Sequence, residues 1–135
     1  MKSKRIKGLN DQWSEYILCL LLHMILPLLP LLMEWLFTRN ISESSLSITT
    51  AIYSISIGLS SKNKAMFGYC ILIGVLFSAI YGVTVSQNSL AIDISAFCFI
   101  ALLTVFLFHA AERYNRHVVD CQSFLLFSDK QVDSI

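Results

Sequence analysis

The most constraining feature of the sequence is a long apolar run near its start. Residues 16–37 read YILCLLLHMILPLLPLLMEWLF, which is long enough to cross about 30 Å of hydrocarbon as a single helix. A cleaved signal peptide is the alternative, because lysines and an arginine precede the run. The run is too long for a signal peptide, however, and no small-residue cleavage site follows it. We therefore predict a first membrane-spanning helix here.

The composition agrees with a membrane protein. Of the 135 residues, 56% are hydrophobic and only 14% are charged, whereas a soluble domain of this size exposes too much surface for so apolar a chain. The net charge of +1 provides no electrostatic footprint for DNA or RNA. These values exclude a nucleic-acid-binding module, a disordered tail and most soluble enzymes, and the length leaves room for one domain.

Two further apolar runs follow in the second half of the chain. Residues 65–85 and 90–111 are each long enough to span a bilayer, and only four polar residues separate them. So short a connection predicts an antiparallel helical hairpin formed by these two segments.

The segment 44–61 is harder to interpret, because it has no charge but is dense in serine and threonine. Its alternation of polar and apolar residues resembles a strand. A lone strand in lipid cannot satisfy its backbone hydrogen bonds, and Ile48, Ile52, Ile55 and Leu59 fit one face of a helix. We predict a fourth, relatively short and polar helix.

The distribution of basic residues predicts the orientation. With four spans, nine of the ten lysines and arginines lie on one side and only Arg39 lies on the other, which is a strong positive-inside pattern. The fold class is therefore all-α: a polytopic four-transmembrane-helix bundle of the inner membrane, with both termini in the cytoplasm. Its parts are a basic arm (1–15), a transmembrane domain (16–111, with spans 16–37, 44–61, 65–85 and 90–111) and a cytoplasmic tail (112–135).

Unusual residues of the first span fall on one stripe. At about 100° per residue, spacings of 4, 4, 3 and 4 place them on one helix face. The prolines remove hydrogen bonds to the carbonyl groups of residues 23 and 26, so we expect a kink with two freed acceptors. The stripe either lines a hydrated path or hinge, or faces the bundle interior, where the second helix satisfies its polar groups. It consists of Cys19, His23, Pro27, Pro30 and Glu34.

Two acidic residues are predicted to lie in the outer leaflet. Glu34 and Asp93 are each within about a turn of the outer end of a span. In an oligomer they could form an acidic ring of the kind that selects cations. Alternatively, Asp93 is a first-turn residue that the helix dipole and the exposed backbone donors favour.

Small residues at a spacing of about four form packing stripes on two spans. Such stripes let another helix approach closely. Two grooves in so small a bundle favour a homo-oligomer, although the sequence does not say whether each partner is intramolecular. The stripes are Cys70, Gly74, Ser78 and Gly82 on the third span and Thr50, Ser54 and Gly58 on the second.

No residue pattern indicates catalysis, a cofactor or a metal. The cysteines Cys19, Cys70, Cys98 and Cys121 are scattered, without a CxxC motif or a reason to expect disulfides. His117 and Cys121 are spaced like two ligands, but a metal site needs more. Phosphate-binding loops and hydrolase motifs are missing from the sequence. We expect a protein that is not an enzyme.

The two ends offer surfaces for partners. Glu112 and Arg116 are spaced as an i,i+4 ion pair on a helix that continues beyond the last span. The basic arm suits anionic membrane lipid. A short apolar run in the tail needs burial, which we interpret as docking of a cytoplasmic partner protein. This run is Phe124, Leu125, Leu126 and Phe127.

In topology, with four spans, short loops and a cytoplasmic tail, the whole chain resembles the small membrane subunit of the Kiwa anti-phage defence system, and next the membrane immunity proteins of pore-forming colicins. The first resemblance implies an oligomeric membrane platform that senses envelope disturbance during phage infection and binds a cytoplasmic effector. Our main hypothesis is such a sensor and scaffold. The alternatives are a small homo-oligomeric ion-conducting pore and an immunity protein against a pore-forming toxin.

Overall fold

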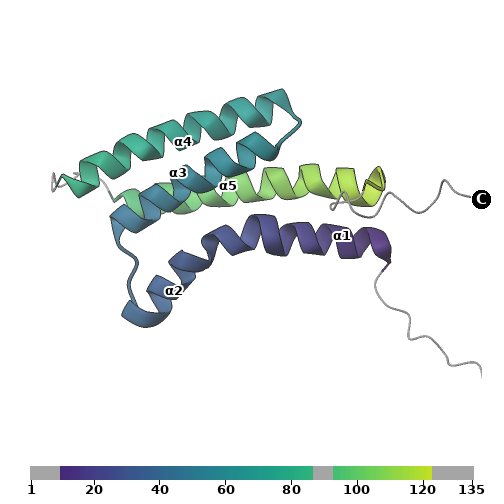
Figure 1. Cartoon of the computed structure of the whole chain (residues 1–135). Helices are drawn as coiled ribbons and strands as arrows, with labels where there is room; N and C mark the ends of the chain where they lie inside the picture. The colour runs from purple at the N-terminus through teal and green to yellow at the C-terminus, as the bar shows by residue number, and fades with distance from the viewer. Residues whose placement is uncertain (1–9, 87–92, 123–135) are drawn as a thin grey trace, which may run out of the picture.

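In the computed structural model, residues 10–86 and 93–122 are described, and these two ranges contain helices but no strand. Long helices run alternately in opposite directions (Figure 1). In chain order the elements are α1 (Asp11–Cys19), a π-helical stretch (Leu20–Ile25), a 3-10 turn (Leu26–Leu28), α2 (Leu29–Thr38), α3 (Glu43–Ser60), α4 (Lys64–Val85), α5 (Ile94–Tyr114) and a second π-helical stretch (Asn115–Val119).

The alternating directions give the molecule two ends. The start of α1, the α3–α4 turn and the end of α5 meet at one end, which we call the Lys62 end (Figure 1). The end of α2 and the starts of α3 and α5 lie at the other, which we call the Arg39 end.

Capping residues explain where the helices begin and stop. The hydroxyl of Ser42 accepts a hydrogen bond from the Ser45 N–H at 3.2 Å at the start of α3, and the Asn63 side chain accepts one from Ala65 at 2.9 Å at the start of α4. At the end of α2, Arg39 adopts a left-handed backbone conformation with φ of 58°. These three residues therefore determine where α2 ends and where α3 and α4 begin.

The segment 44–61 is a helix, as the sequence predicts. It forms α3, which contacts α4 extensively and also packs on α5. The Ser47 and Thr50 hydroxyls donate to the carbonyls of Glu43 and Leu46, at 2.8 and 2.7 Å, which lets polar residues lie in a helix interior away from water.

The two segments predicted as an antiparallel hairpin, 65–85 and 90–111, do run in opposite directions as α4 and α5, but they are not the most closely packed pair. The α4 helix makes most of its contacts with α3 and only a few with α5, so the close antiparallel pair is α3 with α4. The physical reason lies in the small residues: a Cβ on Gly58 would be 2.8 Å from the Cys70 Cβ, and a Cβ on Gly74 would overlap with Ile55 Cγ1. The two predicted grooves therefore face each other within one chain.

Only part of the small-residue stripe on α4 is used in this contact. Cys70 and Gly74 are buried against α3, whereas Ser78 and Gly82 are exposed. Thr50 and Ser54 on α3 are fully buried. The buried parts of both grooves have a partner within the chain, so those parts do not by themselves call for a second copy.

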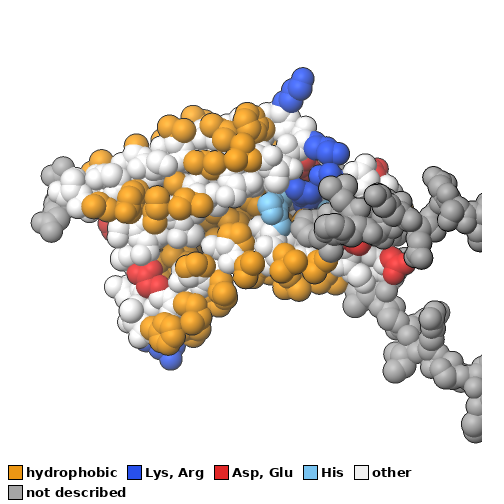
Figure 2. All heavy atoms as spheres, viewed as in Figure 1, with side chains coloured by type: hydrophobic (Ala, Val, Ile, Leu, Met, Phe, Trp, Pro, Cys, Tyr) orange, Lys and Arg blue, Asp and Glu red, His pale blue; other side chains and the backbone are white. Residues whose placement is uncertain are grey.

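The exterior of the bundle is strongly apolar. Large hydrophobic side chains cover it (Figure 2), and many of them are half exposed or more, such as Leu72 on α4 and Phe108 on α5. Three helical stretches are long and apolar enough to cross a membrane, namely Asp11–Thr38, Lys64–Val85 and Ile94–Val119. The chain is thus consistent with a helical membrane protein.

Candidate functional site

Three helical segments bring ionisable and hydroxyl side chains together near the Lys62 end. His23 comes from the π-helical stretch of the first helix and Ser60 from the last turn of α3. The last turns of α5 provide the others. We call this set the polar cluster: His23, Ser60, His109, Glu112 and Arg113.

Ser60 lies at the centre of the cluster. Its Oγ is 2.8 Å from His23 Nε2 and 3.5 Å from His109 Nε2, and it donates a hydrogen bond of 2.8 Å to the Ile57 carbonyl. A hydroxyl has one hydrogen to donate, so Ser60 accepts its bond from His23. The centroids of the two imidazole rings are 5.8 Å apart. The Ser60 hydroxyl therefore joins the first helix to α3, whereas its 3.5 Å contact with His109 is between two acceptors and is not a hydrogen bond.

Arg113 defines the protonation of His109. The Arg113 Nε–H donates to His109 Nε2 at 3.0 Å, so that ring nitrogen is an acceptor and the imidazole proton lies on Nδ1. Nδ1 is 3.4 Å from a carboxylate oxygen of Glu112. The Arg113 Nη2 also donates to the Ser60 carbonyl at 3.0 Å, at the end of α3, where a cation is favoured by the helix dipole.

Glu112 holds the turn between α3 and α4. Its carboxylate accepts hydrogen bonds from the Ser61 hydroxyl at 2.7 Å and from the Lys62 backbone N–H at 2.9 Å. The predicted pair of Glu112 with Arg116 does not form; the Arg116 Nε donates to the Gln122 side chain at 3.0 Å instead. The Glu112 carboxylate binds the α3–α4 turn because two hydrogen-bond donors of that turn lie beside it.

The cluster has a buried centre, formed by His109 and Arg113, and its charges are balanced. His109 is fully buried and Arg113 is 6% exposed, so both groups depend on protein partners in place of water. The guanidinium of Arg113 and the carboxylate of Glu112 offset each other's charge. A network of this kind fixes one arrangement of its helices, and the loss of one member leaves the others with unmet hydrogen bonds.

Aromatic side chains reinforce the same junction between the first helix and α5. The rings of Trp13, Tyr16 and Tyr114 contact one another edge to face, with centroids 5.8 to 6.0 Å apart. The Tyr16 hydroxyl donates to the Ala110 carbonyl at 3.4 Å, and the Gln12 side chain donates to the Cys121 sulfur at 2.9 Å. The first helix is therefore joined to α5 mainly at this end.

The predicted stripe on the first helix is not continuous. Cys19 is buried and His23 half-buried, but Pro27 and Pro30 are exposed and Glu34 is half-buried. The prediction assumed a regular α-helix, whereas the π-helical stretch Leu20–Ile25 winds by fewer degrees per residue and turns the later positions away from the bundle.

The predicted freed acceptors also need a correction. The Leu26 carbonyl, expected to be free because of Pro30, accepts the N–H of Leu29 in the 3-10 turn. Pro27 and Pro30 each lie in the first turn of a new helical segment, where a missing N–H is tolerated. The tighter 3-10 winding after the π-helical stretch thus provides a donor for the Leu26 carbonyl, which was expected to lack one.

The two acids at the Arg39 end serve the starts of helices. Glu34 accepts from the Ser42 N–H at 3.2 Å and from the Ser42 hydroxyl at 3.0 Å, which ties the end of α2 to the start of α3. Asp93 caps α5 and accepts from the Ser95 N–H at 2.9 Å. Both carboxylates therefore have a role within a single chain.

Ser60 and Arg113 are the members of the cluster that sequence reasoning missed. A comparison of how deep each segment lies in the membrane could have identified them. The α3–α4 turn and the last turn of α5 are both next to lysines or arginines, which indicates that they lie at the same end. The apolar run from Phe124 to Phe127 lies outside the described residues.

No metal-binding group emerges from the described part of the chain. There, His, Cys, Asp and Glu side chains do not gather in threes or more in a way that could hold an ion. His117 Nδ1 lies 2.7 Å from the Gln122 carbonyl, so this histidine and Cys121 each contact a neighbouring residue.

Comparisons with known proteins provide no family for this chain. No protein-family model matches the sequence, and neither curated proteins nor solved structures yield a match.

Proposed function

We propose that the chain crosses the membrane four times, with α3 as the short second span. The 18 residues of α3 extend about 27 Å at 1.5 Å per residue, close to the thickness of the hydrocarbon core. Ile52 and Leu59 point outward and are 58% and 70% exposed, while Ser47, Thr50 and Ser54 are fully buried. That arrangement suits a helix whose surroundings are lipid.

We also propose that the Lys62 end faces the cytoplasm of the cell that bears this protein in its inner membrane. Lys62, Lys64, Arg113 and Arg116 belong to this end by their positions in the elements, and Arg39, which follows α2, belongs to the other. The positive-inside rule then places both chain ends in the cytoplasm.

The function that we propose is a membrane sensor and scaffold that recruits a cytoplasmic effector. The observation that supports it is the polar cluster, which links the irregular first helix to α3 and to the end of α5 at the proposed cytoplasmic side. In this proposal, a disturbance of the membrane shifts the first helix, and the cluster transmits the shift to the segment that leads into the tail.

The first helix is suited to the sensing role because few contacts hold it along its length. Its π-helical and 3-10 stretches interrupt the regular hydrogen-bond ladder, and leucines such as Leu21 and Leu32 are about half exposed. Elements with few buried contacts move at low cost in free energy. The bond between His23 and Ser60 is where such a movement reaches α3.

The resemblance to the anti-phage membrane subunit suggests the stimulus and the partner. We propose several copies of the chain acting as a platform, disturbance of the envelope by an infecting phage as the stimulus, and a soluble effector bound through the tail. Direct nucleic-acid binding by this chain and catalysis are not part of the proposal.

The experiment is a mild-detergent pull-down from native membranes, with mass measurement of the intact complex. We expect a stoichiometric soluble partner with several copies of this chain. Ser60→Ala should weaken retention of the partner, because it removes the acceptor of the His23 N–H and with it the bond between the first helix and α3. Ser56→Ala on the exposed face of α3 is the matched control and should retain the partner. A homo-oligomer without any partner would contradict the proposal.

Ion flux through the purified protein in liposomes distinguishes the pore alternative. A pore with Glu34 and Asp93 at its mouth should lose flux when either is replaced by its amide. The helix-capping bonds of both carboxylates favour a structural role over that pore. Association with a toxin's helices inside the bilayer would instead indicate the immunity alternative.

A further inference from the structure

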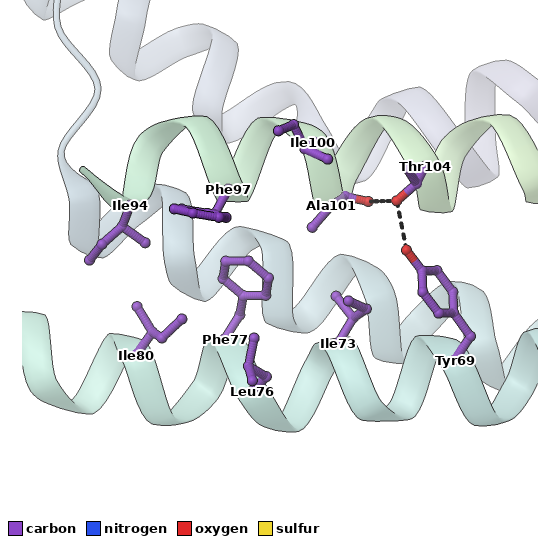
Figure 3. A pocket seen from close by; sticks show the side chains of 10 residues that line it. All are labelled: Tyr69, Ile73, Leu76, Phe77, Ile80, Ile94, Phe97, Ile100, Ala101 and Thr104. Atoms are coloured by element: carbon purple, nitrogen blue, oxygen red, sulfur yellow. Dashed lines mark hydrogen bonds between the residues drawn. The ribbon is translucent and has the colours of Figure 1, made fainter. Parts of the chain in front are cut away.

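A groove opens between α4 and α5, the two helices that the sequence predicts as an antiparallel hairpin. It encloses about 420 Å³, within the range of small-molecule pockets, and its lining is almost entirely apolar (Figure 3). Ile73, Phe77 and Ile80 extend into it from α4, and Ile94 and Phe97 from α5. The groove exists because α4 packs on α3 and leaves few of its residues in contact with α5.

A hydrogen bond marks the end of the groove that is nearer to Lys62. The hydroxyls of Tyr69 and Thr104 are 2.8 Å apart and join α4 to α5 there (Figure 3). Tyr69 also lines a second, smaller cleft, whose other walls include Asn63, Phe108 and Glu112. The apolar groove and the second cleft thus share a wall.

The second cleft leads on to a polar mouth at the Lys62 end. Asn63, Phe108 and Glu112 line both the second cleft and a third one, and the third is also lined by Lys62, Arg116 and Asp120. From Ile80 to Lys62, the lining therefore changes from hydrocarbon through hydroxyl to charged groups. This is the polarity profile of a phospholipid, from its acyl chain to its phosphate.

The charges at the mouth suit a phosphate. Lys62 and Arg116 line it, and Lys64 begins α4 next to it. Of the two acids in the lining, Glu112 is already engaged by Ser61, by the Lys62 backbone and by the adjacent His109, which leaves Asp120 as the opposing charge. Arg116 donates one hydrogen bond to Gln122, and a guanidinium has five N–H donors.

The charges at the mouth favour a lipid over a partner helix. On α5 the lining of the groove and its mouth runs from Ile94 to Arg116, or about 33 Å along a helix, so the length alone does not distinguish the two occupants. A phospholipid combines an apolar chain with an anionic phosphate, and the basic mouth matches that phosphate.

We propose that the cleft between α4 and α5 binds one phospholipid, with an acyl chain between Ile73 and Phe97 and the phosphate at Lys62 and Arg116. The proposal rests on the four-span topology proposed above and does not depend on the recruitment of an effector. It assigns the membrane itself as a specific ligand of the bundle.

Native mass spectrometry of the full chain tests this proposal. The detergent-purified protein is incubated with phosphatidylglycerol or with a diacylglycerol that has the same acyl chains and no phosphate. We expect one phosphatidylglycerol retained per chain and no retained diacylglycerol. The double variant Lys62→Gln with Arg116→Gln should weaken retention by roughly fivefold for each charge removed. Arg39→Gln, at the opposite end, should retain the lipid.

A second pair of variants tests the apolar groove. Leu76→Trp places a larger ring in the lining and should abolish retention, whereas Leu72→Trp, one turn away on the same helix and outside the lining, should not. Both positions are at least half exposed, so neither variant disturbs the core. Equal retention of diacylglycerol, or an equal loss in the Leu72 or Arg39 control, would overturn the proposal. If the wild-type chain retained no phosphatidylglycerol but still bound the effector, only the lipid site would be refuted, and the proposed recruitment of an effector would stand.

Discussion

At the scale of single residues, two glycines decide which helices meet. Gly58 and Gly74 lie where α3 and α4 approach most closely, and a methyl group at either position would overlap with the facing helix. Gly68 lies on the same helix as Gly74, but a Cβ there would have no atom within 4 Å. The glycines of this bundle thus differ in role although the sequence presents them alike.

We predict that Gly58→Ala destabilises the bundle. The added Cβ would lie 2.8 Å from the Cys70 Cβ, which is fixed to its backbone, so α3 and α4 must separate. We expect a loss of about 1–3 kcal/mol in the free energy of unfolding, the usual cost of overpacking. Denaturant titration in detergent micelles measures it.

The matched control is Gly68→Ala on the open face of α4. It should be neutral or stabilising by up to about 1 kcal/mol, because alanine favours helix more than glycine does. Equal destabilisation by both substitutions would show that helix propensity or lipid contact, and not the α3–α4 approach, determines the effect.

At the scale of elements, the first helix differs from the others because of its winding. The π-helical stretch Leu20–Ile25 and the 3-10 turn Leu26–Leu28 divide it, and a proline is the second residue both of this turn and of α2. In Figure 1, α1 and α2 lie along different directions as a result.

We predict that replacing Pro27 and Pro30 together by alanine straightens this helix. Restored N–H donors allow regular bonds, so spin labels at positions 14 and 37 should approach the separation of an unbroken helix, about 35 Å. Double electron–electron resonance measures the distance. Leu32→Ala in the same helix is the control. If the proline variant keeps the wild-type distance, contacts with the bundle and not the prolines determine the winding.

The sequence predicted the helices better than their pairing. Each of the four predicted spans overlaps helix in the structure, including the serine-rich segment, because backbone hydrogen bonding in lipid leaves few alternatives. The pairing of α3 with α4 depends on the fit of Gly58 to Cys70 and of Gly74 to Ile55. Periodicity reveals that such small residues share a face, but not which helix will meet them.

The same limit applies to the candidate site. His23 was identified from its position within an apolar run, and His109 and Glu112 are visible as ionisable residues near the end of the last span. Their connection through Ser60 could not be predicted, because it depends on the depth and rotation of three helices at once. The π-helical winding of the first helix changes that rotation, and no pattern in its sequence specifies it.

At the scale of the whole molecule, α3 is central and yet the least apolar of the long helices. It packs on both α4 and α5, and its buried face holds Ser47, Thr50 and Ser54. If α4 and α5 cross the bilayer, a helix that runs beside α4 from the Arg39 end to the Lys62 end crosses it as well (Figure 1). The fourth span that we propose is thus inferred from packing, because hydropathy alone selects three helical stretches of the described residues.

We predict that the two ends of α3 lie on opposite sides of the membrane. In a Cys121→Ser background, where the remaining cysteines of the chain are buried, Asn40→Cys and Ala65→Cys each introduce one exposed thiol. A membrane-impermeant maleimide should label position 40 in intact cells and position 65 only after permeabilisation. Labelling of both positions from the same side would contradict the fourth span. The inverse pattern would keep four spans but place the Lys62 end outside, against the positive-inside rule. In that case the polar cluster would face away from any cytoplasmic effector, so this measurement also decides whether the proposed coupling can act.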